Sequence, residues 1–496
     1  MGMGRYRSLA HHACTVGNRV GFAPGTRVGR EPAERIHQRV GRSKHPLGEQ
    51  GATTVITIPR IVIAGTHSGC GKTTVARGIM ESLVRRGYTV QPYKVGPDFI
   101  DPTHHSAICG RISRNLDPFM MGEDGLKATF ARNSAGADIA IIEGVMGMYD
   151  GIDGGDRAST AHVMRILSSP AVLVTDARGM SRSVHALVKG FMDFEPGIRI
   201  SGVIFNRMGS PRHREMINEG RTYPALGYIP RSKGLEIKSR HLGLEMAYEI
   251  RRTEGLGELI DEHCDIDRVL EIARAAEPLP GISHEEENTE SRVRIGVARD
   301  EAFCFYYQDN LDLLVRSGAR IIPFSPLSGN LPEVDALYLG GGYPELHAAG
   351  LEASPCRGRI KKAADDGMPV YAECGGLIYL CQEFRGERAY RMAGIIPADS
   401  FMSGKVRALG YAEGTWDAGP AWSPVGNAIL GHEFHYSGVE CDSDAQFAIT
   451  LRRGKGILDG KDGLCSGEAI ATYTHAYFSP EFARSLVDAA LGYQRT

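Results

Sequence analysis

The sequence predicts an α/β protein built from two doubly wound domains, and three observations support this fold class. Short apolar runs alternate with segments of helix length, first over residues 58–275 and again over residues 292–496. Such alternation is typical of a parallel sheet covered by helices on both faces. The stretch between the two series, 276–291, is rich in proline, glycine and acidic residues and indicates an exposed linker. The total length of 496 residues also exceeds what one hydrophobic core supports.

Eight apolar runs are predicted to be strands. They occupy residues 60–65, 137–144, 170–177 and 200–207 in the first series and 292–300, 319–326, 334–342 and 368–376 in the second. A helix is expected directly after the first run, because Val75, Ile79 and Leu83 recur one helical turn apart and Gly87 follows as a stop. Another helix is expected at 266–276, just before the linker.

The composition is that of an ordinary globular protein. Charged residues make up 23% of the chain, hydrophobic residues 42%, and the formal net charge is −2. A net charge this close to zero gives no reason to expect binding to nucleic acid or to an anionic membrane. No apolar run approaches the roughly 18 residues that span a bilayer. The ten cysteines are scattered without C-x-x-C spacing, which is typical of free thiols, so a cytoplasmic protein is expected.

Residues 1–57 differ from the rest of the chain. They are rich in arginine, glycine and histidine and show no apolar periodicity. A secretory signal would require a continuous apolar segment, and this stretch has none. We therefore expect a disordered extension and assign it no function.

The stretch IVIAGTHSGCGKTT (61–74) predicts a phosphate-binding loop between a strand and a helix. The usual pattern is G-x-x-x-x-G-K-[ST], but here the first glycine stands one place early, at Gly65, and Thr66 takes its usual position. Such a loop wraps backbone N–H groups around phosphate at a helix N-terminus. Lys72 is expected to reach the β- and γ-phosphates of ATP, and the Thr73 hydroxyl to ligate Mg²⁺.

Two acidic residues stand near strand ends of the first domain. Glu143 closes the run 137–144, and Asp98 follows the next probable strand. Acids at such positions are often helix caps, but a P-loop domain also needs carboxylates to hold its metal ion. We therefore expect Thr73, Asp98 and Glu143 to hold Mg²⁺. Asn206, after another strand, could read the adenine edge or be an ordinary turn residue.

A nucleophilic cysteine is predicted in the second domain. Cys374 follows an apolar strand and precedes a Gly-Gly turn and an apolar segment. A thiol on a sharp strand–helix turn is exposed, and the helix dipole favours its thiolate. The competing interpretation is a small buried core residue. A cysteine nucleophile needs a base distant in sequence, for which we choose His475, with His432 and His435 as competitors.

The loop GTHSGCGKTT (65–74) resembles those of dethiobiotin synthetase and its relatives, in which threonine and serine occupy the early positions. That branch comprises P-loop enzymes that activate carboxylates. The resemblance implies ATP contacts from Thr66, Ser68, Gly69, Gly71, Lys72, Thr73 and Thr74.

The remainder of the first half resembles the cobyrinate a,c-diamide synthase family. The matching stretches are YKVGPDFIDPTHHSAICGR (93–111), RNLDPFM (114–120), IIEGVMGMYDG (141–151) and SRHLGL (239–244). In these enzymes ATP activates a carboxylate of a corrinoid. The resemblance therefore implies that the substrate is faced by Asp98, Asp101, Tyr149 and Asp150. The adjacent pair His104 and His105 is expected to contact substrate or to lie at the surface.

The second half resembles the class I-like glutamine amidotransferase domain that is fused to corrinoid amide synthases. The matching stretches are VARDEAFCFYYQDNL (297–311), YLGGGYPELHA (338–348), AECGGLIYL (372–380), GHEFHYS (431–437) and THAYF (474–478). The resemblance implies that Cys374 attacks the side-chain amide of glutamine and that His475 raises its nucleophilicity. The GGGYPE loop would supply backbone donors to the oxyanion. Tyr477 stands where a second histidine is expected.

The two halves together predict one reaction. ATP converts a carboxylate to an acyl phosphate with a good leaving group, and the fused glutaminase delivers ammonia locally. The expected reaction is amidation of the a and c acetate side chains of cobyrinate, in cobalamin biosynthesis, with ATP and Mg²⁺ as cofactors. Ni-sirohydrochlorin, a precursor of coenzyme F430, and hydrogenobyrinate stay open as substrates.

The expected partners are small molecules only: a corrinoid or Ni-tetrapyrrole, L-glutamine and ATP, with a homodimer left open. A non-enzymatic ATPase switch of the Min or Par type is the alternative class. Such switches do not need a domain with Cys374 and His475. They also usually carry an extra lysine at the start of the loop, where this chain has Gly65 and Thr66.

Overall fold

The computed structural model describes residues 55–231, 239–240, 243–244, 255–280 and 290–495, which all belong to one compact unit. The predicted extension up to residue 54, most of the predicted linker and the centre of the SRHLGL motif lie outside the described residues. Within the described ranges, no helix combines the length and the apolar character needed to cross a membrane.

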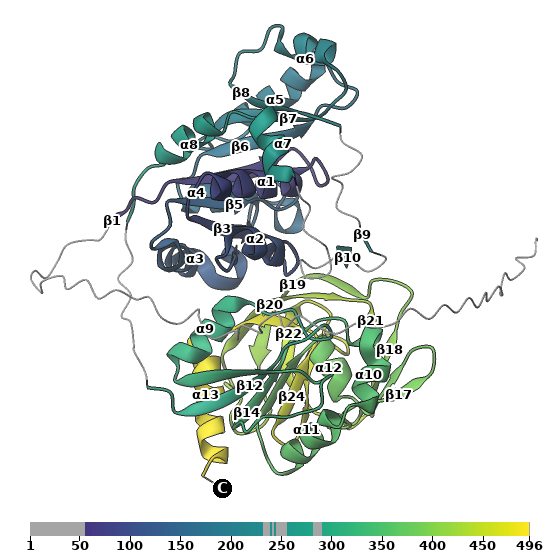
Figure 1. The fold of residues 1–496 in the computed structure, drawn as a ribbon. Coiled ribbons are helices and arrows are strands. Elements are labelled where there is room, and N and C mark those ends of the chain that lie inside the picture. The colour runs from purple at the N-terminus through teal and green to yellow at the C-terminus, as the bar shows by residue number, and fades with distance from the viewer. Residues whose placement is uncertain (1–54, 232–238, 241–242, 245–254, 281–289, 496) are drawn as a thin grey trace, which may run out of the picture. The chain divides into compact units, whose positions relative to one another are not determined.

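The first half of the chain contains a seven-stranded sheet in which every neighbouring pair is parallel (Figure 1). The order is β4 (Arg114–Leu116), β3 (Val90–Val95), β5 (Ile139–Glu143), β2 (Arg60–Gly65), β6 (Ala171–Asp176), β7 (Ile200–Met208) and β8 (Ala225–Pro230). The four strands predicted here are confirmed. In β2, Val62 packs into the core on one face and Ile63 into the core on the other. Burial on both faces explains why this strand is apolar without alternation.

Helices cover both faces of this sheet. The core on one face includes residues of α1 (Lys72–Arg85), α7 (Leu256–His263) and α8 (Ile266–Arg274), and the core on the other face includes residues of α3 (Pro118–Ser134), α4 (Thr160–Ile166), α5 (Ser183–Asp193) and α6 (Pro211–Asn218). The short α2 (Asp101–Cys109) and η1 (Ile152–Gly154) complete this half. The predicted α1 is confirmed, because Val75, Ile79 and Leu83 are fully buried and Gly87 adopts a left-handed conformation just beyond the helix.

The second half contains a ten-stranded mixed sheet. Five neighbouring strands are parallel: β13 (Ala319–Phe324), β12 (Val293–Ala298), β14 (Ala336–Leu339), β15 (Val370–Glu373) and β24 (Ala469–Thr472). The sheet continues through antiparallel pairs with β23 (Lys461–Ser466), β22 (Phe447–Arg453), β19 (Ala408–Trp416), β20 (Ala428–His435) and β25 (His475–Tyr477). The four strands predicted here all belong to the parallel part. The antiparallel part was not predicted, because no helices separate most of its strands.

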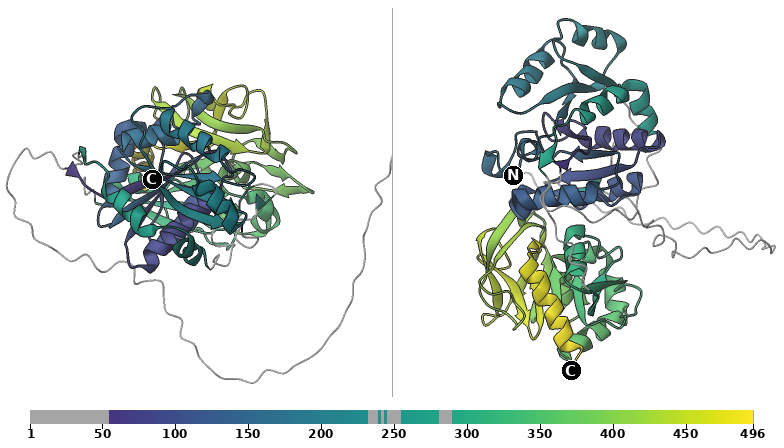
Figure 2. Two further views of the ribbon diagram at one scale, coloured as in Figure 1. Left: turned by 90° about the horizontal axis from the view of Figure 1, so that it is seen from above. Right: turned by 90° about the vertical axis from the view of Figure 1, so that its left-hand side faces the viewer.

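Two helical layers pack on the ten-stranded sheet. One core contains residues of α9 (Gln308–Arg316) and α13 (Pro480–Tyr493), which lie together on the same side of the sheet (Figures 1 and 2). The other contains residues of α10 (Ala348–Ala353), α11 (Cys356–Asp365) and α12 (Gly375–Leu380). A short helix, η2 (Pro344–His347), precedes α10. A four-stranded sheet flanks this half, in the order β17 (Ala389–Arg391), β16 (Glu383–Arg385), β18 (Ala398–Met402) and β21 (Ser437–Cys441).

Two small antiparallel pairs lie outside the large sheets. β1 (Val55–Ile56) pairs with β11 (Leu279–Pro280), and β9 (Ser239–Arg240) pairs with β10 (Gly243–Leu244). β1 falls within the predicted extension and β11 within the predicted linker. They form regular structure because Leu279 is buried and Ile56 packs against the same core.

Polar contacts join the regions that carry the two large sheets. They are the ion pair of Arg114 with Asp312 (2.6 Å), the hydrogen bond from the Tyr411 hydroxyl to Asp117 (2.7 Å), and the two bonds from Arg453 to Asp153 (2.6 and 2.8 Å). An apolar cluster of Phe119, Met120, Ala158 and Tyr307 accompanies them. Residues of the first sheet region therefore contribute directly to the surroundings of the second.

Candidate functional site

The phosphate-binding loop lies between β2 and α1, as predicted. Its early glycine has a packing reason. A Cβ atom at Gly65 would come within 2.6 Å of both the Cys70 sulfur and the Lys72 side chain, so only glycine lets these two groups fold back over the end of β2. Further along the loop, Gly71 caps α1 in a left-handed conformation with φ 102°. The irregular spacing is therefore built into the packing of this loop.

A cavity of about 640 Å³ opens above this loop. It brings together most of the predicted nucleotide and metal residues, namely Ser68, Gly69, Gly71, Lys72, Thr73, Thr74, Asp98, Asp101, Glu143 and Asn206. Three basic residues that the sequence analysis did not single out, Lys94, Arg207 and Arg231, also line it. Burial lowers the pKa of Lys72, although the nearby carboxylates oppose this effect.

Glu143 is the centre of a buried hydrogen-bond network. The Thr73 hydroxyl donates to its Oε1 over 2.5 Å, the Lys94 ammonium donates to the same oxygen over 2.8 Å, and the His105 Nε2 lies 2.7 Å from Oε2. Burial alone would raise the pKa of Glu143, but Lys94 and His105 outweigh it and hold this pKa below its usual range. Glu143 is therefore a carboxylate.

Lys94 places a positive charge among three carboxyl groups. Its Nζ lies 2.5 Å from Asp101, 2.8 Å from Glu143 and 3.8 Å from Asp98. Burial opposes the charge, but the attraction of these carboxylates raises the pKa of Lys94 overall. Burial and the neighbouring Asp101 raise the pKa of Asp98 to about 6. The sequence could have indicated Lys94 only as a lysine at the end of an apolar strand.

The oxygen atoms of Thr73, Glu143 and Asp98 suit Mg²⁺, which prefers hard oxygen ligands. Across the described residues, no group of three or more His, Cys, Asp or Glu side chains is arranged to hold a metal by itself. Mg²⁺ is usually bound by one or two carboxylates together with substrate phosphates and water, so this donor set fits a nucleotide-dependent site.

The side chains of Asn206 and Arg207 donate hydrogen bonds to carbonyl groups of the phosphate-binding loop. The Asn206 amide donates to the Cys70 carbonyl over 3.0 Å, and the Arg207 guanidinium donates to the Gly69 carbonyl over 2.9 Å. Arg207 also pairs with Asp176 at 2.7 Å and has a positive φ of 58°. Asn206 therefore lines the cavity, but its side-chain amide donates to the backbone of the loop.

Three predicted residues do not line the cavity. The Thr66 hydroxyl contacts the His67 ring, the Tyr149 hydroxyl donates to the Phe191 carbonyl over 2.6 Å, and Asp150 accepts from the Gly147 amide over 2.8 Å. The expectation for the histidine pair also needs correction. His104 and His105, both on α2, are buried rather than exposed, and the His105 ring lies against Glu143.

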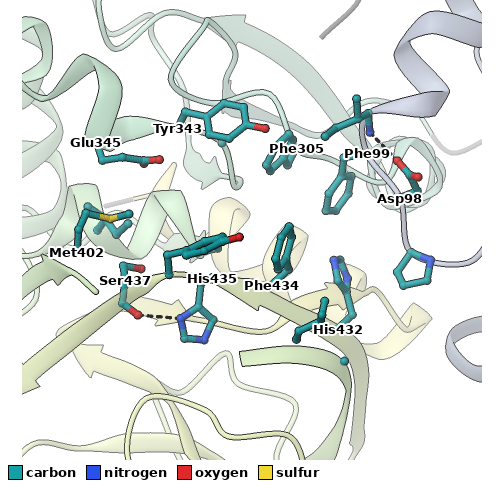
Figure 3. Close-up of a pocket in the computed structure, with 18 of the residues that line it drawn as sticks. Asp98, Phe99, Phe305, Tyr343, Glu345, Met402, His432, Phe434, His435 and Ser437 are labelled. Carbon is teal, nitrogen blue, oxygen red and sulfur yellow. Dashed lines mark hydrogen bonds between the residues drawn. The ribbon is translucent and has the colours of Figure 1, made fainter. Parts of the chain in front are cut away.

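Cys374 stands on a sharp turn between β15 and α12, as predicted. Its backbone has φ 48° and ψ −94°, and its amide donates to the Thr472 carbonyl over 2.7 Å. A positive φ at a residue with a side chain is strained, and such strain concentrates at functional sites. The residue is 7% exposed and lines a second cavity of about 290 Å³ (Figure 3).

The candidate bases lie on neighbouring strands beside this cavity. His475 of β25 pairs with His432 of β20, and their rings stack with centroids 4.9 Å apart. The His475 ring lies against Gly341, where a Cβ atom would come within 2.3 Å of its Cε1. His432 shares a hydrogen bond of 2.8 Å with the Tyr307 hydroxyl. His432 and His435 line the cavity, whereas His475 lies behind its surface.

Burial controls the charges of this site. It raises the pKa of the Cys374 thiol, and the nearby Glu345 and Glu373 add to this effect. It also lowers the pKa of His475 well below its usual value and that of His432 to about 3. The expected thiolate is therefore not favoured here, because burial outweighs the short α12. The thiol and the imidazoles are all neutral.

Glu373 supports the histidine strand from the side of the cysteine. Its carboxyl group accepts from the Tyr338 hydroxyl over 2.9 Å and from the Ala476 amide over 3.0 Å. Burial raises the pKa of Glu373 to about 8. The residues before the nucleophile and after the histidine are thus tied together, although the residue two places after His475 is Tyr477 and not an acid.

Comparison with known proteins agrees with both halves of the site. Residues 61–244 match the family model described as the CobQ/CobB/MinD/ParA nucleotide binding domain, and residues 294–482 match the CobB/CobQ-like glutamine amidotransferase domain. The cobyrinate a,c-diamide synthase of Methanosarcina barkeri is 44% identical over 483 residues, covering 89% of this chain and 98% of that protein. The enzyme of the same name from Listeria innocua is 40% identical, covering 84% and 96%. A solved glutamine amidotransferase structure covers 40% of this chain and 98% of its own at 14% identity and a TM-score of 0.30, which is too low for an inference.

Proposed function

Because the chain belongs to the cobyrinate a,c-diamide synthase family, we propose that it amidates the a and c acetate side chains of cobyrinate with ATP and glutamine. Residues 58–275 form the ligase domain in this proposal, and residues 292–496 form the glutaminase domain. The observation that carries it is that the P-loop cavity and the Cys374 cavity share a lining residue, Asp98. Two sites that meet at one residue suit a reaction in which one site consumes what the other releases.

In the ligase half, a substrate carboxylate oxygen attacks the γ-phosphorus of ATP, giving an acyl phosphate and ADP. The loop amides and Lys72 hold the phosphates, and the glycines of the loop allow close approach. Mg²⁺, held by Thr73, Glu143 and Asp98, would neutralise phosphate charge. Asp98 and Asp101, which line the same cavity, would also contact the substrate. The substrate contacts that the resemblance implies for Tyr149 and Asp150 stay predictions, although the Tyr149 hydroxyl donates to the Phe191 carbonyl and Asp150 accepts from the Gly147 amide.

In the glutaminase half, Cys374 gives its proton to His475 as its sulfur attacks the side-chain carbonyl carbon of glutamine. The tetrahedral oxyanion would accept hydrogen bonds from amides of the Gly340–Glu345 loop. A Cβ atom at Gly375 would come within 3.0 Å of the Gly342 nitrogen, which supports this loop as the donor. Ammonia leaves with the proton returned by His475, and water then hydrolyses the thioester to glutamate.

Ammonia completes the reaction by attacking the acyl phosphate carbon, and phosphate leaves. The neutral imidazole of His475 suits a base, because only the unprotonated ring can accept the thiol proton. The same steps would amidate Ni-sirohydrochlorin, the alternative substrate.

The test is product analysis by mass spectrometry with cobyrinate and Ni-sirohydrochlorin offered separately. Each reaction contains ATP and Mg²⁺ with either glutamine or ammonium as the nitrogen source. We expect diamide from cobyrinate with both nitrogen sources. Cys374→Ser should abolish the glutamine-dependent reaction and retain the ammonium-dependent one, whereas Lys72→Ala should abolish both. Amide formation on Ni-sirohydrochlorin alone would replace the substrate, and no amide on either would refute the proposal.

A further inference from the structure

Asp98 and Phe99 are consecutive residues of one loop, but they differ in the cavities that they line. Asp98 and Phe99 lie between β3 and α2, in the region that matches the nucleotide-binding family model. Asp98 lines both cavities, whereas Phe99 lines only the one that contains Cys374. This loop is therefore a wall that the two sites share.

The Phe99 ring packs among four aromatic rings of the other half of the protein. It stacks on Phe305 with centroids 5.2 Å apart and an interplanar angle of 8°, and it lies 4.8 Å from Tyr307. It also lies 5.4 Å from the His432 ring and 5.2 Å from the His475 ring. Figure 3 shows Phe99 beside Phe305 and His432, with Asp98 next to it on the same loop. A ligase-side residue thus covers both histidines.

Asp98 ties the backbone on each side of Phe99 to the carboxylate cluster. Its Oδ1 accepts from the Ile100 amide over 2.8 Å and from the Asp101 amide over 3.1 Å. Its other carboxylate oxygen lies 3.8 Å from the Lys94 ammonium. The Asp98 carbonyl is fixed in turn by the Asn115 amide over 2.8 Å. A loop held at so many points moves as a unit, so a shift of the Asp98 carboxylate also shifts the Phe99 ring.

We propose that Phe99 is a positioning residue that makes glutamine hydrolysis depend on occupation of the P-loop cavity. In the arrangement described here, Lys94 holds the carboxylates and the Phe99 ring covers His432 and His475. Magnesium, nucleotide and acceptor all bring charge to the cluster beside Asp98. Their binding shifts the Asp98 carboxylate, moves the Phe99 ring away from His432 and His475, and so frees His475 to accept the Cys374 proton. The inference rests on the proposed function and deepens it.

The coupling has a physical basis in the burial of the glutaminase groups. His475 is 2% exposed, and its Nδ1 has no hydrogen-bond partner among the described residues. Because four rings enclose Phe99, a small displacement changes the packing around both imidazoles at once, and packed cores respond to such changes discretely. Without the Phe99 ring, the packing around His432 and His475 would no longer depend on the position of the Asp98 loop.

The test compares glutamate release with amide formation in purified full-length protein. The probes are glutamine alone and glutamine with Mg²⁺-ATP and cobyrinate. In the unmodified protein we expect ATP and cobyrinate to stimulate glutamate release, with about one glutamate per amide, as the stoichiometry of the coupled reaction requires. In Phe99→Ala we expect release with glutamine alone to rise, stimulation to disappear and more glutamate than amide to form. Ammonium-driven amidation should be retained.

Two further variants separate coupling from packing. Phe99→Leu keeps most of the apolar volume, so it should uncouple the reactions while the melting temperature stays near that of the unmodified protein. Phe305→Ala removes a ring from the same cluster but leaves Phe99 and the hydrogen bonds of Asp98 in place, so stimulation should persist. Full stimulation in both Phe99 variants, or its equal loss in Phe305→Ala, would overturn the inference. Failure of the unmodified protein to form any amide would instead overturn the proposed function.

Discussion

The Thr73 hydroxyl donates a hydrogen bond of 2.5 Å to the carboxylate of Glu143, which lies 70 residues away in the sequence. Thr73 stands at the start of α1, and Glu143 ends the neighbouring strand β5. A strand-end carboxylate and a helix-start hydroxyl thus meet where the phosphates of a bound nucleotide would lie. A substitution that removes the Thr73 hydroxyl therefore removes this hydrogen bond.

Thr73→Val should weaken the use of Mg²⁺, because valine keeps the shape of threonine but has no oxygen. Loss of one supporting or liganding group typically reduces metal affinity by about 10- to 100-fold. The measurement is the Mg²⁺ concentration for half-maximal amidation with ammonium as donor, which excludes the glutaminase site. Thr73→Ser keeps the hydroxyl and should stay close to the unmodified protein. Equal Mg²⁺ dependence in the valine and serine variants would contradict a metal role for Thr73.

Lys94→Met should destabilise the protein strongly. The substitution keeps the length of the side chain but leaves Asp101 and Glu143 without their shared cation, and removing one partner of a buried ion pair costs about 3–5 kcal/mol. Urea unfolding measures the loss. Adding Asp101→Asn removes one of the stranded charges, so the double variant should recover part of the stability. Simple additivity of the two substitutions would show that the 2.5 Å contact between Lys94 and Asp101 carries no coupling.

Asp117 should make stability depend on pH. It is fully buried, accepts from the Tyr411 hydroxyl over 2.7 Å, and burial raises its pKa from 3.8 to about 6. The folded state therefore binds a proton more tightly than the unfolded state. The resulting stabilisation is present below about pH 4 and is lost as pH rises through 6, with a full span of about 3 kcal/mol.

Asp117→Asn removes this titration but keeps an oxygen that accepts from the backbone. The free energy of unfolding of the unmodified protein minus that of the variant should therefore be larger at pH 4.5 than at pH 7.5. Comparing the two proteins at each pH cancels the other titrating groups. A difference that is constant, or that grows with pH, would show that Asp117 is not held in its protonated form.

The parallel strands and the main motifs were predictable because their signals are local. The run that became β2 is apolar and ends in Gly65, and Cys374 stands between a strand and a glycine pair. Lys94 was not predictable as the centre of this cluster, since its contact with Glu143, 49 residues away, forms only when β3 and β5 pair. Phe99 was equally hidden, because a single aromatic residue in a loop carries no periodic signal. Both depend on contacts that form only when separate strands meet.

The antiparallel half of the second sheet was missed for a different reason. Strands joined without intervening helices do not show the alternation from which the parallel part was predicted. The charge state at Cys374 also depended on the tertiary structure. Sequence position favoured a thiolate, but the degree of burial, which local sequence does not determine, reversed the expectation.

The backbone strain at Cys374 gives the last prediction, which is that Cys374→Gly should be more stable than Cys374→Ala. Glycine usually destabilises a folded protein by roughly 0.5–1 kcal/mol relative to alanine, because it has more freedom in the unfolded chain. At Cys374, however, φ is 48°, and a side chain held in such a conformation costs about 1–3 kcal/mol. Strain relief therefore outweighs the entropic cost.

Urea unfolding of the two variants at neutral pH measures this balance. Ala372→Gly, two residues earlier in β15, is the matched control because Ala372 is also buried and its φ is not positive. There the substitution should destabilise the protein in the ordinary way. If Cys374→Gly proves less stable than Cys374→Ala, the turn is not strained. If it proves more stable, the protein gives up folding stability to hold a thiol on this turn at the cavity wall, which is expected of a nucleophile and not of a core cysteine.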